Sequence, residues 1–483
     1  MASVIPLLLL TVLTQGPAAP DCPTLLAGLR EKIAANYAGH VLEVRGARAA
    51  VHRDLLAALS REAAGAEGEG CRVVLQRLVD WYDDPHLFLF QSSRLDSVET
   101  RRRQATLARH PVEEEAVLAA LAARSDADPI EGIWFEGARR MAVVPATERG
   151  RFLAVITASD TTTLPVGAVV ARIARTGPGV YRVARLANSL AETVARGTLH
   201  REGTLLRLSP GMWGKAAPQP ASADGLLDPD DVHRPTLQVR DDAIIIAVPS
   251  HDPGLRPVLE RLLREHAEAL RSGLPLLVDL RGNEGGGSQT TAALMPFLMD
   301  ATPRPRQHEF TEALMLSSPD QIRYASRSFG PDTSAFVRRL VTEMRAHPGE
   351  LVPLFDPAER PELAAEVVPV EGPRAVAVLI DRGTVSAAEV TVLEVQRSRR
   401  AVVIGEPTAG ALDYQNTSIV PIIEGERRWY LGYPTITAHG ELPEHGIRGR
   451  GIAPDVAVDW SRVDDPYATA LRILAERVRQ EES

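Results

Sequence analysis

Apolar residues recur at helical spacing along the first quarter of the chain. Thr24–Tyr37, Ala49–Ala64 and Cys71–Trp81 place apolar side chains three or four positions apart, which is the pattern of an amphipathic helix. Pro111–Ala123 has the same spacing and carries three glutamates near its start, Glu113–Glu115, which the N-terminus of a helix favours. Residues 21–128 are therefore predicted to form a helical domain.

The pattern changes to short runs of β-forming residues over 129–216. Gly, Pro and Asp turns separate these runs, and this spacing predicts a small antiparallel sheet or barrel. The following stretch, 217–233, contains Pro, Ala and Asp with little periodicity, and we interpret it as a linker. The expected strands are Arg139–Pro145, Phe152–Thr157, Ala168–Ala174, Val180–Leu186 and Thr204–Leu208.

Residues 234–483 alternate apolar strand runs with amphipathic helices, which is typical of an α/β domain. Two strand–turn–helix units share one design, VDLRGNEGGG (Val278–Gly287) and LIDRGTVSAAEV (Leu379–Val390). Ligands gather at the carboxyl ends of such strands, where free N–H groups of a helix N-terminus can stabilise an oxyanion. We expect strands at Asp242–Val248, Leu274–Leu280, Ala375–Asp381 and Ala401–Ile404, and helices at Leu255–Arg271, Thr290–Met299, Asp332–Ala346, Ser386–Ser398 and Asp465–Gln480.

Composition narrows the class of protein. A chain of 483 residues with 45% hydrophobic and 24% charged residues is typical of a folded protein with several domains. The net charge of −9 gives no indication of a nucleic-acid surface. The apolar run Val4–Leu13 is too short to span a membrane, and we interpret residues 1–20 as a signal peptide of an exported, periplasmic or secreted protein. In that setting Cys22 and Cys71 can form a disulfide.

The candidate nucleophile has a structural alternative. Ser386 begins the second helix and, with Glu389, matches the capping box S-x-x-E, so it can be a helix cap only. Three consecutive glycines, Gly285–Gly287, can equally serve only a tight turn. The sequence contains no zinc motif, Walker A loop or G-x-S-x-G elbow. We therefore expect no metal and no cofactor.

Four segments together carry a family resemblance. Val278–Gly287, Thr384–Glu389, VVIGEPTAG (Val402–Gly410) and GIAPDVAV (Gly451–Val458) follow in an order that resembles the C-terminal processing, or tail-specific, peptidase family. Its relatives include the tricorn core protease and the interphotoreceptor retinoid-binding protein. The resemblance implies a crotonase-like (Clp protease-like) β-spiral catalytic domain and a serine-type endopeptidase that hydrolyses polypeptides through an acyl-enzyme.

The resemblance also implies roles for single residues. Ser386 matches the nucleophile, and the N–H of Ala387 matches one donor to the oxyanion. Gly285 or Gly286 would supply the second donor. A serine hydroxyl needs a base to take its proton, so the identity of that base decides which branch of the family the chain resembles.

The base resembles that of the tricorn-like branch. Bacterial members with a Ser–Lys dyad have lysine after the T-x-G motif, where this chain has Ala411. The lysines present, Lys32 and Lys215, lie outside the catalytic region. The segment LVDWYDDPHLFLF (Leu78–Phe90) resembles the D-x-H motif of the histidine-dependent branch, which implies His86 as general base.

That branch adds two supporting residues to the serine and histidine. The residue before the histidine is serine there and Pro85 here, so this member is missing or is replaced by Asp84. For the late glutamate, Glu444 in GELPEHGIRG is our first choice and Glu441 our second.

Other features concern substrate binding. The chain shows no G-L-G-F-like loop of a PDZ domain, so specificity for C-terminal tails is not inferred. Asp279, Arg281 and Asn283 are interpreted as turn-shaping residues, and Arg281 has the alternative of pairing with a carboxylate, including that of a substrate tail. Two other functions stay open, a non-catalytic protein that binds apolar ligands or peptides, and an esterase. The oligomeric state is left open.

Overall fold

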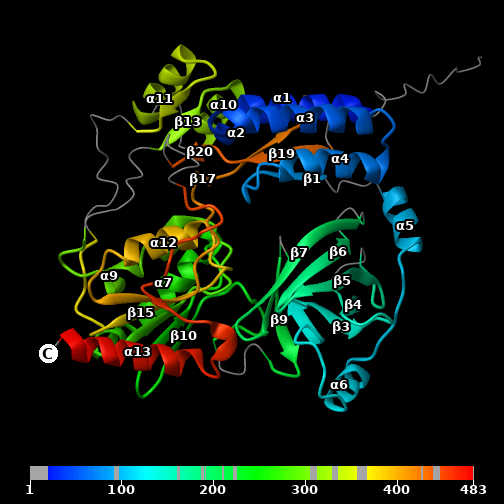
Figure 1. Cartoon of the computed structure of the whole chain (residues 1–483). Helices are drawn as coiled ribbons and strands as arrows, with labels where there is room; N and C mark the ends of the chain where they lie inside the picture. The colour runs from blue at the N-terminus through cyan, green and yellow to red at the C-terminus, as the bar shows by residue number, and fades with distance from the viewer. Residues whose placement is uncertain are drawn as a thin grey trace, which may run out of the picture.

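The computed structural model describes residues 20–91, 97–159, 164–186, 190, 192–208, 211–220, 226–304, 313–328, 335–355, 367–425, 428–438 and 446–481. Its elements form three parts (Figure 1): a layer of helices packed on small sheets, a β-barrel, and an α/β unit. In the described part of the chain, we find no helix with the length and apolarity needed to cross a bilayer.

The α/β unit is built on a six-stranded sheet. Its order is β10 (Thr236–Val239), β11 (Ile244–Ala247), β12 (Leu276–Asp279), β15 (Val376–Ile380), β16 (Ala401–Gly405) and β21 (Val456–Ala457). β10 is antiparallel to β11, and all later neighbours are parallel. Every residue of the three central strands is buried, because helices cover both faces of such a sheet. This explains their continuous apolar runs.

The helices of this unit are shorter than the periodicity predicts. The expected helix Leu255–Arg271 is divided into η1 (Pro253–Leu255), α7 (Arg256–Glu265) and α8 (Ala267–Leu270), because His266 between α7 and α8 has φ −110° and ψ 21°. The expected helix Thr290–Met299 is also divided, into the 3-10 turn η2 (Ser288–Thr291) and the short helix α9 (Met295–Leu298). The remaining elements of the unit are α12 (Ala387–Val395), η4 (Trp460–Arg462) and α13 (Pro466–Glu481).

The middle of the chain forms a closed, eight-stranded antiparallel barrel. The last strand pairs with the first, with Phe135 opposite Gly214, so the sheet has no free edge. Trp134, Met141 and Val183 fill its interior. The first, sixth and last strands were not predicted from the sequence. The strands are β2 (Gly132–Glu136), β3 (Arg139–Pro145), β4 (Arg151–Ala158), β5 (Val169–Gly177), β6 (Val180–Leu186), β7 (Glu192–His200), β8 (Leu205–Leu208) and β9 (Met212–Ala217), preceded by α5 (Ser97–Ala105) and α6 (Glu114–Ala122).

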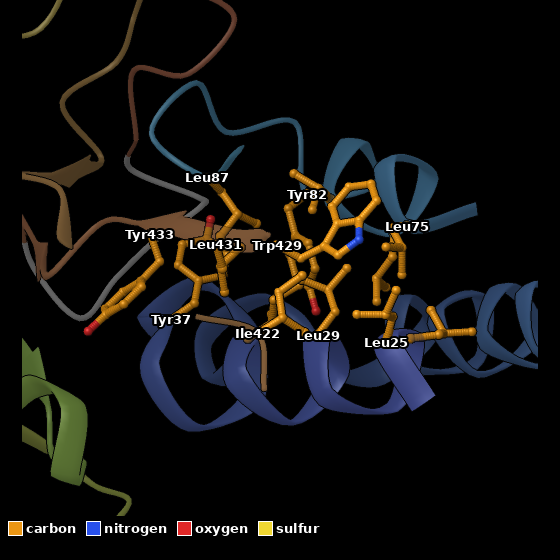
Figure 2. Packing of buried hydrophobic residues seen from close by; sticks show 14 of the residues in the cluster. Leu25, Leu29, Tyr37, Leu75, Tyr82, Leu87, Ile422, Trp429, Leu431 and Tyr433 are labelled. Carbon is orange, nitrogen blue, oxygen red and sulfur yellow. The ribbon is translucent and has the colours of Figure 1, made fainter. Parts of the chain in front are cut away.

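Both ends of the chain contribute to the helical layer. Strand β1 pairs antiparallel with β19, Phe88 opposite Gly432, and β19 pairs with β18. Figure 2 shows the shared core, in which Leu29 and Leu75 of the helices pack with Trp429 and Leu431. The elements are α1 (Cys22–Asn36), α2 (Ala38–Glu43), α3 (Gly46–Ala63), α4 (Gly68–Asp80), β1 (Phe88–Gln91), β18 (Ser418–Pro421) and β19 (Trp429–Tyr433).

Two further features complete this layer. Cys22 and Cys71 form a disulfide that joins α1 to α4. A small sheet of β14 (Leu351–Pro353), β13 (Leu314–Leu316), β20 (Ile436–Thr437) and β17 (Tyr414–Gln415) lies beside α10 (Pro319–Ser328) and α11 (Ala335–Ala346).

Candidate active site

Ser386 lies in the turn between β15 and α12, at the carboxyl edge of the central sheet. Its backbone has φ 55° and ψ −116°, a conformation that costs a non-glycine residue about 1–3 kcal/mol. Surrounding contacts hold this turn, since Val385 N–H donates to Asn283 O at 2.9 Å and Thr384 Oγ1 donates to Leu280 O at 3.0 Å. The strain therefore presents a half-buried hydroxyl above the sheet edge.

His86 reaches the serine from the other end of the chain. Its Nε2 lies 3.1 Å from Ser386 Oγ, which is within hydrogen-bond reach of a base and its nucleophile. The helical layer places it there, because His86 lies two residues before β1, which pairs with β19. The structure thus brings together the two residues to which the sequence assigns nucleophile and base.

The surroundings of His86 suit a neutral base. Burial lowers the pKa of its imidazole below the ordinary value, and the carboxylate of Glu389 with the backbone of Tyr414 and Ala411 opposes this in part. Its Nδ1 is buried and has no hydrogen-bond partner among the described residues. A neutral ring with Nε2 toward the serine is the form that can accept a proton.

Asp84 supports His86 through the main chain and forms no hydrogen bond with its ring. Its Oδ1 accepts the backbone N–H of His86 at 2.8 Å, and its Oδ2 accepts the hydroxyl of Tyr37 at 2.8 Å. Burial raises the pKa of this carboxyl to about 7, against the hydrogen bonds from His86 and Tyr37. Asp84 therefore shapes the turn that carries the histidine, and it does not replace the partner of Nδ1.

Glu389 is the main site residue that sequence reasoning missed. It was interpreted as half of a capping box, and its Oε2 does accept the N–H of Ser386 at 2.8 Å. The same buried carboxylate also accepts Thr408 Oγ1 at 2.6 Å, Gly410 N–H at 2.7 Å and Ala411 N–H at 2.9 Å. Burial raises its pKa, and these donors oppose the rise. Glu389 thus ties the nucleophile turn to the GEPTAG segment.

The glycine turn lies directly against the nucleophile. A Cβ at Gly285 would stand 2.9 Å from Ser386 Cβ and 3.1 Å from the nitrogen of Ala387, so only glycine fits. The N–H of Gly285 donates to Asn283 Oδ1 at 2.8 Å, which removes Gly285 from the candidate donors. The N–H groups of Gly286 and Ala387 have no acceptor among the described residues. Gly286 is therefore the better second donor.

Arg281 does pair with carboxylates, as its alternative role required, but they belong to the protein and not to a substrate. The side chain is buried and donates to Asp279 at 2.8–3.0 Å and to Glu202 of the barrel at 2.6 Å. Tyr467 donates to the same Asp279 at 2.8 Å. The guanidinium is thus fully paired inside the protein, which agrees with a turn-shaping role.

Neither lysine approaches the serine. Lys32 forms an ion pair with Asp320 at 2.8 Å, and Lys215 donates to Pro129 O in the barrel. Ala411, at the position of the family's lysine, is buried next to Glu389. This arrangement agrees with the exclusion of a Ser–Lys dyad.

A pocket of about 680 Å³ opens beside the glycine turn. It lies between the end of β12, the turn after β11 and the start of β9, and so offers space next to the candidate oxyanion donors. Its lining comprises Met212, Asp231, His233, Ser250, Asp252, Pro253, Gly254, Leu255, Glu284, Gly285 and Gly286.

The two late glutamates, Glu444 and Glu441, lie outside the described residues. Segments on either side are anchored at one point, since Ala438 N–H donates to Asp413 O at 3.0 Å and Ile447 N–H to Asp413 Oδ1 at 2.7 Å. Within the described ranges, no group of three His, Cys, Asp or Glu side chains is arranged to hold a metal ion.

The lowered pKa of His86 predicts the pH dependence of the site. Protonation blocks the base, and burial disfavours the imidazolium, so reactivity should fall only as pH drops through a midpoint below the ordinary histidine pKa of about 6.5. The rate of serine modification by a fluorophosphonate, measured from about three pH units below neutrality to about two above it, reports this midpoint.

Asp84→Asn provides the control for this profile. The amide keeps an acceptor for the N–H of His86 and removes the carboxyl whose pKa is about 7. The midpoint should stay in place in this variant. A midpoint above the ordinary histidine pKa in the wild type would contradict a buried, neutral base.

We compared the chain with known proteins, solved structures and family models. No curated protein matches the chain. Among solved structures, mature CPAF aligns with a TM-score of 0.44 at 14% identity, over 94% of this chain and 96% of that one. The photosystem II D1 C-terminal processing protease gives 0.39 at 12%, over 94% and 98%, and the tricorn protease gives 0.39 at 10%, over 95% and 37%. Residues 245–458 match the family model described as Peptidase family S41, and this stretch contains Ser386.

Proposed function

The chain belongs to peptidase family S41 and is a serine peptidase, and on this premise we propose that Ser386 is its nucleophile and His86 its general base. The observation that carries the proposal is the 3.1 Å contact between His86 Nε2 and Ser386 Oγ, made by two residues 300 positions apart. The matched stretch contains the serine and not the histidine, so the base comes from outside it.

The reaction follows from this geometry. His86 Nε2 takes the proton of Ser386 Oγ as the oxygen attacks the substrate carbonyl carbon, and the N–H groups of Ala387 and Gly286 hold the oxyanion. The protonated imidazole then gives this proton to the leaving amine, which leaves an ester on Ser386. Water attacks that ester, His86 accepts its proton, and the acid product departs as the hydroxyl of Ser386 is restored.

The third residue is proposed from the chain path. Nδ1 of His86 has no partner among the described residues, and an imidazolium needs an acceptor there. The backbone of Tyr414 lies beside the ring, and the adjacent Asp413 binds Ile447, three positions after Glu444. We therefore keep Glu444 as the candidate acceptor, with Glu441 second.

The finer assignments are proposals of the same kind. We propose the crotonase-like β-spiral fold for the α/β unit, supported by its buried parallel strands. We also propose that residues 1–20 are a signal peptide and that the mature protein acts outside the cytoplasm. The Cys22–Cys71 disulfide supports this location.

The test of the function is covalent labelling. The purified protein is incubated with a broad fluorophosphonate probe, and the adduct is located by peptide mass spectrometry. Labelling should occur on Ser386 and be absent in Ser386→Ala. Hydrolysis of fluorescent casein and of a panel of ester substrates, run beside it, separates a peptidase from an esterase. A well-folded wild type that is neither labelled nor active would favour a binding protein.

A further inference from the structure

One histidine of the barrel reaches the turn that carries the nucleophile. His200 is the last residue of β7, and its Nδ1 lies 2.6 Å from Asp381 Oδ2. Both side chains are buried, with 7% and 8% of their surface exposed. Asp381 directly follows β15 and stands five residues before Ser386. No step of the proposed reaction uses this pair.

The other oxygen of Asp381 joins the two turns of the site. Oδ1 accepts the N–H of Gly282 at 2.9 Å and the N–H of Gly383 at 2.8 Å. Gly282 belongs to the turn that continues to the oxyanion glycines, and Gly383 belongs to the nucleophile turn. Burial alone would raise the pKa of Asp381, but His200 and the hydrogen-bond donors outweigh burial and hold it below its ordinary value. One ionised carboxylate therefore cross-links both turns.

Both turns are shaped to receive the histidine. A Cβ at Gly383 would stand 2.4 Å from His200 Cε1, and a Cβ at Gly282 would stand 3.4 Å from His200 Cβ. Glycine at these positions lets the imidazole lie against bare backbone. The ion pair of Glu202 with Arg281, at 2.6 Å, flanks this contact in the same hairpin. The barrel therefore contacts both turns directly through His200.

We propose that His200 is a positioning residue of the serine site. By holding Asp381, it keeps the turn of Ser386 and the turn of the oxyanion donors in register, so the barrel is part of the catalytic unit. The kinetic consequence rests on the proposed peptidase function, whereas the order of the two turns does not.

The kinetic test compares three variants with wild type through inactivation by the fluorophosphonate. In His200→Leu the maximal inactivation rate should fall about 30- to 100-fold, because displacements near 1 Å at a reacting centre have effects of this size. The probe concentration for half-maximal rate should stay within about twofold, since no probe contact is removed. His200→Asn, which keeps an N–H near the place of Nδ1, should recover the rate to within about fivefold. Arg196→Gln, at an exposed position of the same strand β7, should match wild type.

Hydrogen exchange of the same proteins tests the positioning without turnover. Exchange over residues 278–290 and 379–390 should be faster in His200→Leu and unchanged in the other two variants. An inert wild type would overturn the peptidase function while exchange still decides the role of His200. Unchanged exchange in both turns with an unchanged rate would overturn the positioning role. Faster exchange throughout the chain in His200→Leu, with no rescue by His200→Asn, would also overturn it.

Discussion

Replacement of His86 by alanine should lower kcat by about 10⁴-fold or more, and Ser386→Ala should lower it at least as far. His86 Nε2 lies 3.1 Å from the serine hydroxyl and takes its proton. Without the imidazole, the hydroxyl loses this base. The two residues act as one unit, so the double variant should be about as inactive as either single one. Casein hydrolysis and fluorophosphonate labelling, measured on all three proteins, check this.

His110→Ala is the matched control for the histidine. His110 is exposed on the loop before α6, and its backbone N–H, which binds Gly167 O at 2.9 Å, survives the change. This variant should keep wild-type activity. Additive losses in the Ser386/His86 double variant, or a His86→Ala protein that still reacts at the wild-type rate, would show that another group is the base.

Glu389→Leu should lower the free energy of unfolding by at least about 4 kcal/mol, since each buried donor left without an acceptor costs about 1–3 kcal/mol. Four donors lose their acceptor, from Ser386, Thr408, Gly410 and Ala411. Such a loss is a large share of the about 5–15 kcal/mol that stabilises a folded domain. Urea unfolding followed by circular dichroism measures it, and labelling of Ser386 should disappear in parallel.

Glu394→Leu on the same helix gives the comparison. Glu394 pairs with Arg397 at 2.6 Å near the surface, and such pairs contribute about 0–1 kcal/mol. Its loss should leave both unfolding and labelling close to wild type. Equal effects of the two substitutions would show that Glu389 fills space and does not organise the donors.

Local patterns in the sequence were informative for the two central strands of the α/β unit, which are buried on both faces. The apolar runs before Asp279 and Asp381 predicted two central strands, and the following turns predicted where Ser386 would lie. Of the three barrel strands that were missed, β7 mixes charged residues and Gly197 with few apolar ones. Closure of the barrel, and not local propensity, makes these segments strands.

The remaining site features depend on contacts between distant segments. Glu389 matched a local capping pattern, and the donors from Thr408 to Ala411 that give it a second role come from another loop. The choice between Gly285 and Gly286 required the hydrogen bond to Asn283. No periodicity could reveal that β19 pairs with β1, because the two strands stand at opposite ends of the chain.

This last pairing determines when the enzyme can first act. During synthesis His86 emerges early, but β1 has no partner strand until β19 follows, after the serine and nearly the whole α/β unit. A chain that folds from its N-terminus therefore contains no assembled Ser–His pair while it is incomplete. Products that terminate before β19 therefore lack the strand pairing that places His86 beside Ser386.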